Sequence, residues 1–159
     1  MTSPRGPWRR GGREPVGGRS KRGATTSCKT CRQWAPVLEA VLPHLEEWVD
    51  RPWGGLTYRL TQVLTGHGCF GEYLCRIEKE PTAQCHHCPA EVDSAQHTLE
   101  HCPAWEGLRG VLKDEIGEDL SLGAVIGKMV FRESSWKAVA FFCEQVMLQK
   151  EAAERERER

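Results

Sequence analysis

The stretch from Cys85 to Cys102, with the sequence CHHCPAEVDSAQHTLEHC, constrains this chain more than any other part of it. Cys85 and Cys88 are separated by two residues, His97 follows after eight more, and Cys102 after a further four. Two thiolates on a tight turn, followed by a histidine and a cysteine near a helix end, are the ligand set of a tetrahedral zinc site. The spacing therefore predicts a zinc ion that joins the turn to a separate helix.

The identity of the fourth ligand has two solutions in the sequence. On a short helix ending at residue 100, His97 and His101 lie four residues apart and share a face. Pro103 moves Cys102 out of the helical region, so the Cys102 thiol can also turn back toward the metal. We favour the set with Cys102, keep His101 as the alternative, and predict the ligands Cys85, Cys88, His97 and Cys102.

Four protein ligands would leave no open coordination position, so the zinc would be structural. It would contribute on the order of 10 kcal/mol to the folding of this segment. The alternative interpretation is a set of reduced, partly buried cysteines without a metal. His86 and His87 lie inside the turn and are expected to face solvent or to flank the ligands.

The composition is that of one ordinary domain with charged ends. The 159 residues have a net charge of +0, and 39% of them are hydrophobic, which supports a modest core. The first 22 residues carry seven basic side chains against one acid, a local net charge of +6. Residues 1–33 therefore read as a disordered basic arm. Its Cys28 and Cys31 are best interpreted as incidental thiols, with half of a second metal site or a redox pair as the alternatives.

The cysteines and the hydropathy indicate where such a chain resides. Eight cysteines can form a disulfide scaffold, but these have metal-like spacing, and no signal peptide is visible at the start of the sequence. No window approaches the roughly 18 apolar residues of a membrane span. We expect an intracellular, reducing compartment and no membrane partner.

Apolar residues recur with helical spacing before the motif. Within residues 34–80 the pattern predicts two short helices broken at Pro43, a helix over residues 56–64 and another over residues 69–79. The last two should form a hairpin, and the T-G-H-G turn between them should hold a left-handed glycine cap. His67 in that turn should cap the first helix, with a metal ligand or a phosphate contact as the alternatives. Ser94 or Asp93 should cap the helix inside the motif.

Three more helices are expected after the motif. The first covers residues 104–116, the second begins at Ser121, and the third begins at Ser134 or Ser135. Cys143 lies on the apolar stripe of the last helix, and from Lys150 onward alternating acids and bases indicate a solvated, fraying end. The fold class is all-α: a small helical domain with an inserted Cys-Cys-His-Cys zinc knuckle. Its parts are residues 1–33 (arm), 34–80 (helical segment), 81–106 (knuckle), 107–150 (C-terminal helices) and 151–159 (charged helical tail).

Three segments together are similar to one known family. They are residues 59–74 (RLTQVLTGHGCFGEYL), the motif from Cys85 to Cys102, and the PAWE at residues 103–106. They resemble the region downstream of the reverse transcriptase in the Pol-like protein of non-LTR retrotransposons, especially the type-1 element of insect ribosomal DNA. The resemblance covers about residue 48 to the last residue. In that family this pattern is the C-terminal zinc-binding motif, which implies Cys102 as the fourth ligand.

The resemblance does not carry catalysis over to this chain. The parent polyprotein is an RNA-directed DNA polymerase with an endonuclease, and it copies its own RNA into a nicked chromosomal target. Here no Tyr-x-Asp-Asp occurs, the aspartates are scattered, and the length leaves no room for a polymerase palm. We therefore expect a C-terminal piece without enzymatic activity. The chromosomal target of the family implies nuclear residence.

Two functions are compatible with these patterns. The first is a zinc-dependent module that binds RNA or DNA, with phosphates and unpaired bases contacted beside the knuckle by His86, His87, Arg76, Lys79 and Trp105. The basic arm would add affinity that salt weakens. The second is a zinc-stabilised structural or protein-interaction module, whose partner covers exposed apolar surface on the C-terminal helices. A basic patch around the knuckle favours the first function, and an exposed apolar patch favours the second.

Overall fold

The computed structural model describes residues 29–159, with side chains from residue 35 onward, so the basic arm and the Cys28/Cys31 pair lie outside its described side chains. The elements are α1 (Lys29–Val41), η1 (Leu42–His44), α2 (Leu45–Asp50), α3 (Tyr58–Thr65), α4 (Gly71–Arg76), α5 (Ala95–Glu100), η2 (Pro103–Trp105), α6 (Glu106–Ile116), α7 (Leu122–Phe131) and α8 (Glu133–Arg157). Over these residues the chain forms helices and loops without a strand, which confirms the all-α prediction for this part.

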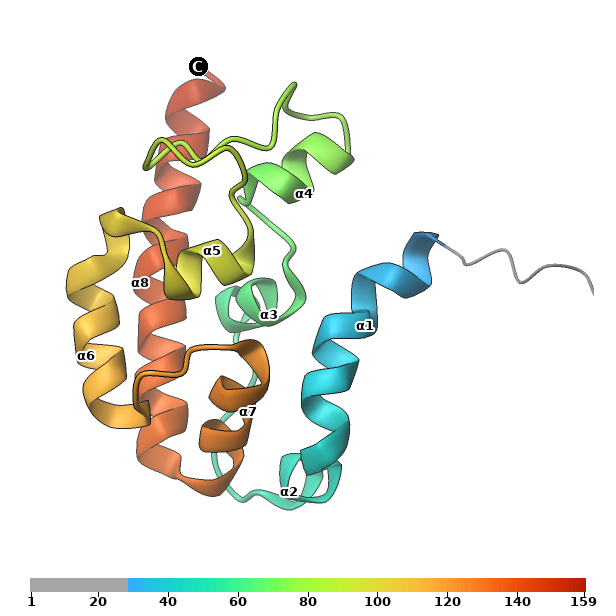
Figure 1. Ribbon diagram of the computed structural model, residues 1–159, viewed down its shortest axis with the longest axis vertical. Helices are drawn as coiled ribbons and strands as arrows, with labels where there is room; N and C mark the ends of the chain where they lie inside the picture. The colour runs from blue at the N-terminus through green and yellow to red at the C-terminus, as the bar shows by residue number, and fades with distance from the viewer. Residues whose placement is uncertain (1–28) are drawn as a thin grey trace, which may run out of the picture.

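The long helix α8 is the centre of the fold, and α3, α6 and α7 pack against it (Figure 1). It has 25 residues, and one face is buried along most of its length. The predicted apolar stripe is confirmed: Trp136, Val139, Cys143, Val146 and Met147 are each no more than 3% exposed. Cys143 is thus a core thiol.

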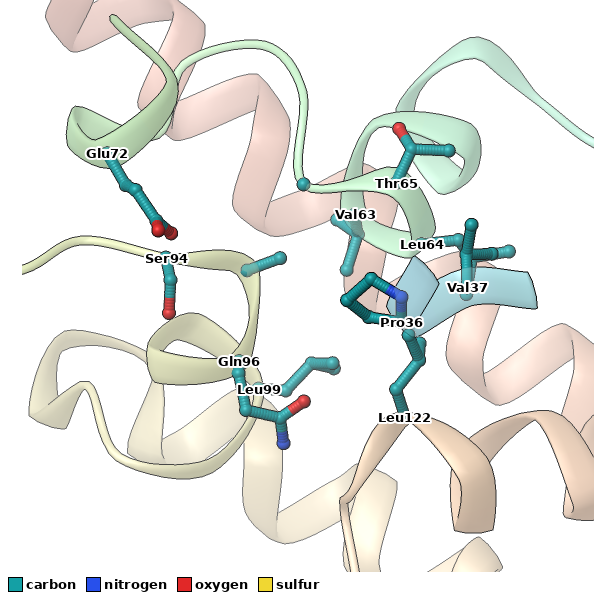
Figure 2. A pocket seen from close by; sticks show the side chains of 12 residues that line it. Pro36, Val37, Val63, Leu64, Thr65, Glu72, Ser94, Gln96, Leu99 and Leu122 are labelled. Carbon is teal, nitrogen blue, oxygen red and sulfur yellow. The ribbon is translucent and has the colours of Figure 1, made fainter. Parts of the chain in front are cut away.

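The N-terminal helices cover the side of the bundle formed by α3 and α7 (Figure 1). Pro43 lies in the short 3-10 segment η1 between α1 and α2, so the predicted break is confirmed. A cavity of about 160 Å³ remains where α1 meets α3, α5 and α7. Figure 2 shows Pro36 and Leu122 on one side of it and Ser94 and Gln96 on the other.

The region before the knuckle differs from the prediction in one respect. Helix α4 has 6 residues instead of the expected helix over residues 69–79. The chain turns sharply at Glu78, whose φ of 62° is left-handed, and the N–H groups of Lys79 and Glu80 both donate to the carbonyl of Leu74. Helix α3 packs on α1, α5 and α8.

Two expected caps of α3 and α5 are present. The Ser94 side chain accepts a hydrogen bond from the N–H of His97 and begins α5. Gly66, with a φ of 69°, ends α3, and the backbone N–H of His67 donates to the carbonyl of Gln62. The expected serine cap of α8 is wrong, because Ser134 and Ser135 lie inside that helix and donate to the carboxylate of Glu115 instead.

Candidate metal centre

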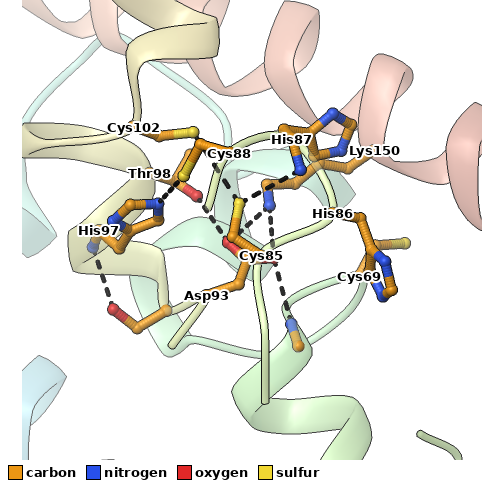
Figure 3. Close-up of polar contacts among 12 residues, drawn as sticks. Cys69, Cys85, His86, His87, Cys88, Asp93, His97, Thr98, Cys102 and Lys150 are labelled. Carbon is orange, nitrogen blue, oxygen red and sulfur yellow. Dashed lines mark hydrogen bonds and ion pairs between the residues drawn. The ribbon is translucent and has the colours of Figure 1, made fainter. Parts of the chain in front are cut away.

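Four side chains from the Cys85–Cys102 stretch converge on one point (Figure 3). The sulfur atoms of Cys85, Cys88 and Cys102 and a ring nitrogen of His97 all lie within 4.8 Å of one another. The Cys85 and Cys102 sulfurs are 4.0 Å apart, and the Cys88 sulfur lies 3.2 Å from His97 Nε2. A tetrahedron with metal–sulfur bonds of about 2.3 Å has edges of roughly 3.8 Å, so these four ligands could hold a metal ion.

The first two ligands are presented by a closed loop. The N–H of Cys85 donates to the carbonyl of Ala90 at 3.0 Å, which brings the two ends of the turn together. The N–H of His87 points at the Cys85 sulfur, 3.4 Å away. A backbone N–H directed at sulfur stabilises the thiolate form that a metal requires. The backbone of this loop therefore favours the thiolate form of Cys85, the form that could bind a metal ion.

The other two ligands are positioned by α5 and by the residues after it. The Ser94 cap fixes the first turn of α5, where His97 lies. The N–H of Cys102 donates to the carbonyl of His97 at 2.8 Å, so the chain folds back and its thiol reaches the cluster. The His101 side chain is 68% exposed and lies 3.7 Å from Glu100. Of the two residues considered for the fourth position, Cys102 is the one within the cluster.

Arg109 holds the backbone of the second half of the site. Its guanidinium is buried and donates to three carbonyl groups, those of Leu99 at 2.7 Å, Thr98 at 3.2 Å and Cys102 at 2.6 Å. Two of these carbonyls lie in the last turn of α5 and the third lies just beyond it, where the helix itself offers no donors. One side chain of α6 thereby fixes the end of α5 and the backbone of a ligand.

A buried ion pair joins the knuckle to α8. Lys150 Nζ lies 2.8 and 2.7 Å from the two carboxylate oxygens of Asp93, and the two side chains are 1% and 2% exposed. Asp93 also accepts a hydrogen bond from the N–H of Gly71, and the Lys150 ammonium lies 5.1 Å from the centre of the Phe70 ring. Lys150 was expected to begin the solvated end of α8, and this is wrong, because its charge is neutralised inside the protein.

Burial shifts the pKa values of three candidate ligands. Desolvation raises the pKa of Cys102 to about 12 and also raises the pKa of Cys85. Desolvation lowers the pKa of His97 below its ordinary value. The imidazole is therefore neutral and ready to bind a cation. On binding a metal ion the thiols would release their protons to solvent, and the charge of the ion would compensate for the burial of the thiolates.

The side chains predicted to contact nucleic acid lie in different surroundings. Trp105 is 3% exposed and packs beside the ring of His87, with 4.8 Å between ring centroids. A buried indole has no free face, so the expected stacking role of Trp105 does not agree with its position. His86 lies at the surface, 3.5 Å from Glu80.

The two predicted cations before the knuckle differ from each other. Arg76 is exposed, and its guanidinium lies 5.1 Å from the centre of the Tyr73 ring. Lys79 is engaged by the carboxylates of Glu154 and Glu158, each 2.6 Å away. A phosphate at Lys79 would have to compete with these two carboxylates.

Three residues that organise the site were not identified from the sequence as part of it: Asp93, Arg109 and Lys150. Asp93 was considered only as a helix cap. The signal for Lys150 was its place on the α8 stripe, since it follows Cys143 by seven residues and Val146 by four.

Comparisons with known proteins identify no relative: no family model, no curated protein and no solved structure matches the chain. Within residues 29–159, none of the helices combines the length and apolar character that crossing a bilayer requires.

Proposed function

We propose that the chain is a zinc-binding module that binds nucleic acid. The observation that carries the proposal is the convergence of three cysteine sulfurs and one histidine nitrogen within 4.8 Å. Three thiolates and an imidazole form a soft donor set that suits zinc better than magnesium, calcium or manganese, which prefer oxygen. The resemblance of residues 59–74 and 85–102 to the C-terminal region of retrotransposon Pol-like proteins is the second support.

The proposed zinc has a structural role. Four protein ligands complete a tetrahedron and leave no position for a substrate or an activated water molecule. The ion would join the Cys85–Cys88 turn to α5 and to Cys102, which directly precedes η2. The stretch of residues 85–102 has few apolar side chains of its own. The proposal assigns no reaction to the chain.

The nucleic-acid surface of this proposal lies beside the knuckle. Residues 80–108 contain no lysine or arginine, and the buried cations Arg109 and Lys150 are used inside the fold. The exposed Arg76 and His86 flank the loop that enters the knuckle. Phosphate contacts would therefore come from α4 and the approach to the knuckle, with the zinc holding that approach in place.

The proposal is tested by measuring the binding of a labelled single-stranded RNA to the full chain. Fluorescence anisotropy reports the affinity with zinc bound and again after zinc is removed. Binding should fall when zinc is removed, should weaken with salt, and should be restored when zinc is returned. His101→Ala should bind as the unmodified chain does, and Cys102→Ser should not. Zinc binding without any nucleic-acid binding would contradict the proposal.

A second candidate function, docking of a protein partner, is supported by one observation. Four large apolar side chains on α1, η1 and α2 are exposed at a spacing of four, three and four residues: Leu38 (53%), Leu42 (60%), Leu45 (48%) and Val49 (70%). The four side chains belong to two helices and the 3-10 segment between them, and adjoining exposed apolar side chains are typical of a protein-binding surface. Size-exclusion chromatography with light scattering tests self-association, and Leu42→Glu should abolish it if a second copy covers this face.

A further inference from the structure

We propose that a groove beside the turn between α3 and α4 binds an unpaired nucleobase of a single strand, an inference that rests on the proposed function. The groove is lined by Tyr58, Gln62, Thr65, His67, Gly68 and Tyr73 and has a volume of about 310 Å³. That volume is at the lower end of the roughly 300–1,000 Å³ typical of small-ligand sites. None of the candidate metal ligands lines the groove, and the predicted contact Arg76 lies beside it, over the Tyr73 ring.

Two tyrosines give the groove planar surfaces on which a base can stack. Tyr58, the first residue of α3, is 74% exposed, so its ring contributes little to the core. Tyr73 also lines the groove, and its ring lies 4.8 Å between centroids from His67 and 5.1 Å from the Arg76 guanidinium. Base stacking on aromatic rings, aided by arginine, is the main source of affinity for single strands.

A buried amide supplies the polar feature that a base edge would recognise. Gln62 is 6% exposed, and its Oε1 atom has no hydrogen-bond partner among the described residues. Buried acceptors without a partner are uncommon in folded proteins. Gln62 lines the groove, so a rotation of its side chain would present this oxygen to the amino group of adenine, cytosine or guanine, and uracil has no such group.

Gly68 makes room for this amide at the wall of the groove. Its φ of +101° is one that side chains rarely adopt, and a Cβ atom there would lie 2.4 Å from Gln62 Nε2. A residue with a side chain would push Gln62 away. The glycine therefore allows the amide to lie against the turn.

The charges around the groove leave two cations available for the phosphates that flank a base. Arg59 is engaged by Glu144 and Glu151, and Lys79 is engaged by Glu154 and Glu158. Arg76 and Arg155 are exposed, and within the described part of the chain neither forms an ion pair. Arg155 lines the neighbouring hollow, which shares Tyr58, Gln62, Gly68 and Tyr73 with this groove.

The test compares Tyr58→Ala with Phe131→Ala, which removes an aromatic ring of similar exposure from α7, away from the groove. Affinity of the zinc-bound protein for short single-stranded RNA is measured by fluorescence anisotropy, and circular dichroism confirms that each variant is folded. Tyr58→Ala should weaken binding about tenfold, Phe131→Ala should leave it unchanged, and Tyr58→Phe should restore it. Adenine- and cytosine-containing strands should bind more tightly than uracil strands, and Gln62→Leu should remove that difference.

The outcomes separate this inference from the proposed function. If the chain binds RNA but Tyr58→Ala and Phe131→Ala behave alike, the groove is not the site, and the proposed function is unaffected. If the unmodified zinc-bound chain binds no nucleic acid, both fail. Ultraviolet crosslinking followed by mass spectrometry gives an independent result: crosslinks should map to peptides with Tyr58 or Tyr73, and crosslinks confined to residues 85–102 would overturn the inference.

Discussion

Replacing Lys150 with methionine should destabilise the protein far more than the loss of an exposed charge would. The ammonium of Lys150 lies 2.7 Å from Asp93, and the two side chains are 1% and 2% exposed. Methionine has a similar length and can occupy the same space beside Phe70. The carboxylate of Asp93 would then stay buried with only neutral hydrogen-bond donors, among them the N–H of Gly71.

The magnitude follows from the burial of the pair. Removing one partner of a buried ion pair costs about 3–5 kcal/mol, because the other charge is left without compensation. For a chain of this length, 1 kcal/mol shifts the midpoint of thermal unfolding by roughly 3–4 °C, so Lys150→Met should lower it by about 10–18 °C. Asp93→Asn should have a similar effect, since it leaves the lysine charge buried.

The assay is urea unfolding of the zinc-saturated protein for both single variants and for the double variant Asp93→Asn, Lys150→Met. The double variant contains neither buried charge, so its loss of stability should be at least ~2 kcal/mol smaller than the sum of the two single losses. The exposed pair Lys137–Glu133 provides the control, because Lys137→Met should cost less than about 1 kcal/mol. Additive losses, or single losses below 1 kcal/mol, would refute the buried-pair reasoning.

Three further predictions follow, two for residues around the knuckle and one for the contact between α6 and the start of α8. Gly71→Ala should destabilise the protein by about 1–3 kcal/mol in thermal unfolding, since a Cβ would lie 2.6 Å from two carbonyl oxygens of the loop before Cys85; Gly110→Ala, on α6 with open space around it, should not destabilise it. Arg109→Met should lower metal affinity about 10–100-fold in a competition titration, because the backbone of a ligand loses its donor. Hydrogen bonds from Ser134 and Ser135 hold the pKa of Glu115 below its ordinary value. The ionised carboxylate therefore contributes fully to folding stability above the ordinary pKa, and this contribution is lost as the pH falls through the lowered pKa. Glu115→Gln should reduce the loss of stability on acidification, measured by thermal unfolding as a function of pH.

The parts of the structure that depend on neighbouring residues could be predicted from the sequence. The Ser94 cap, the glycine at the end of α3 and the apolar stripe of α8 are each specified within a few residues. The candidate ligands fall in the same class, because a tight turn and one short helix bring them together. Here the choice between Cys102 and His101 depended on Pro103, which ends the helix before the thiol.

The features that depend on distant parts of the chain could not be predicted. Lys150 has charged neighbours along α8, and only its partner Asp93, 57 positions away, explains its burial. Trp105 was expected at a nucleic-acid surface, and its burial in the core, where it is 3% exposed, could not be inferred from its neighbours in the sequence. Ser134 and Ser135 bond to Glu115 on another helix, a contact that the local cap pattern does not contain.

The central claim, a single zinc site with three thiolates and one imidazole, is tested most directly by metal titration of the purified chain. Cobalt(II) serves as the spectroscopic probe, and zinc displaces it to give the stoichiometry. The account predicts one tetrahedral metal per chain with the charge-transfer absorption of three thiolates, unchanged in His101→Ala and diminished by one thiolate or lost in Cys102→Ser. No metal binding, or a site that is lost with His101→Ala and unchanged in Cys102→Ser, would contradict it.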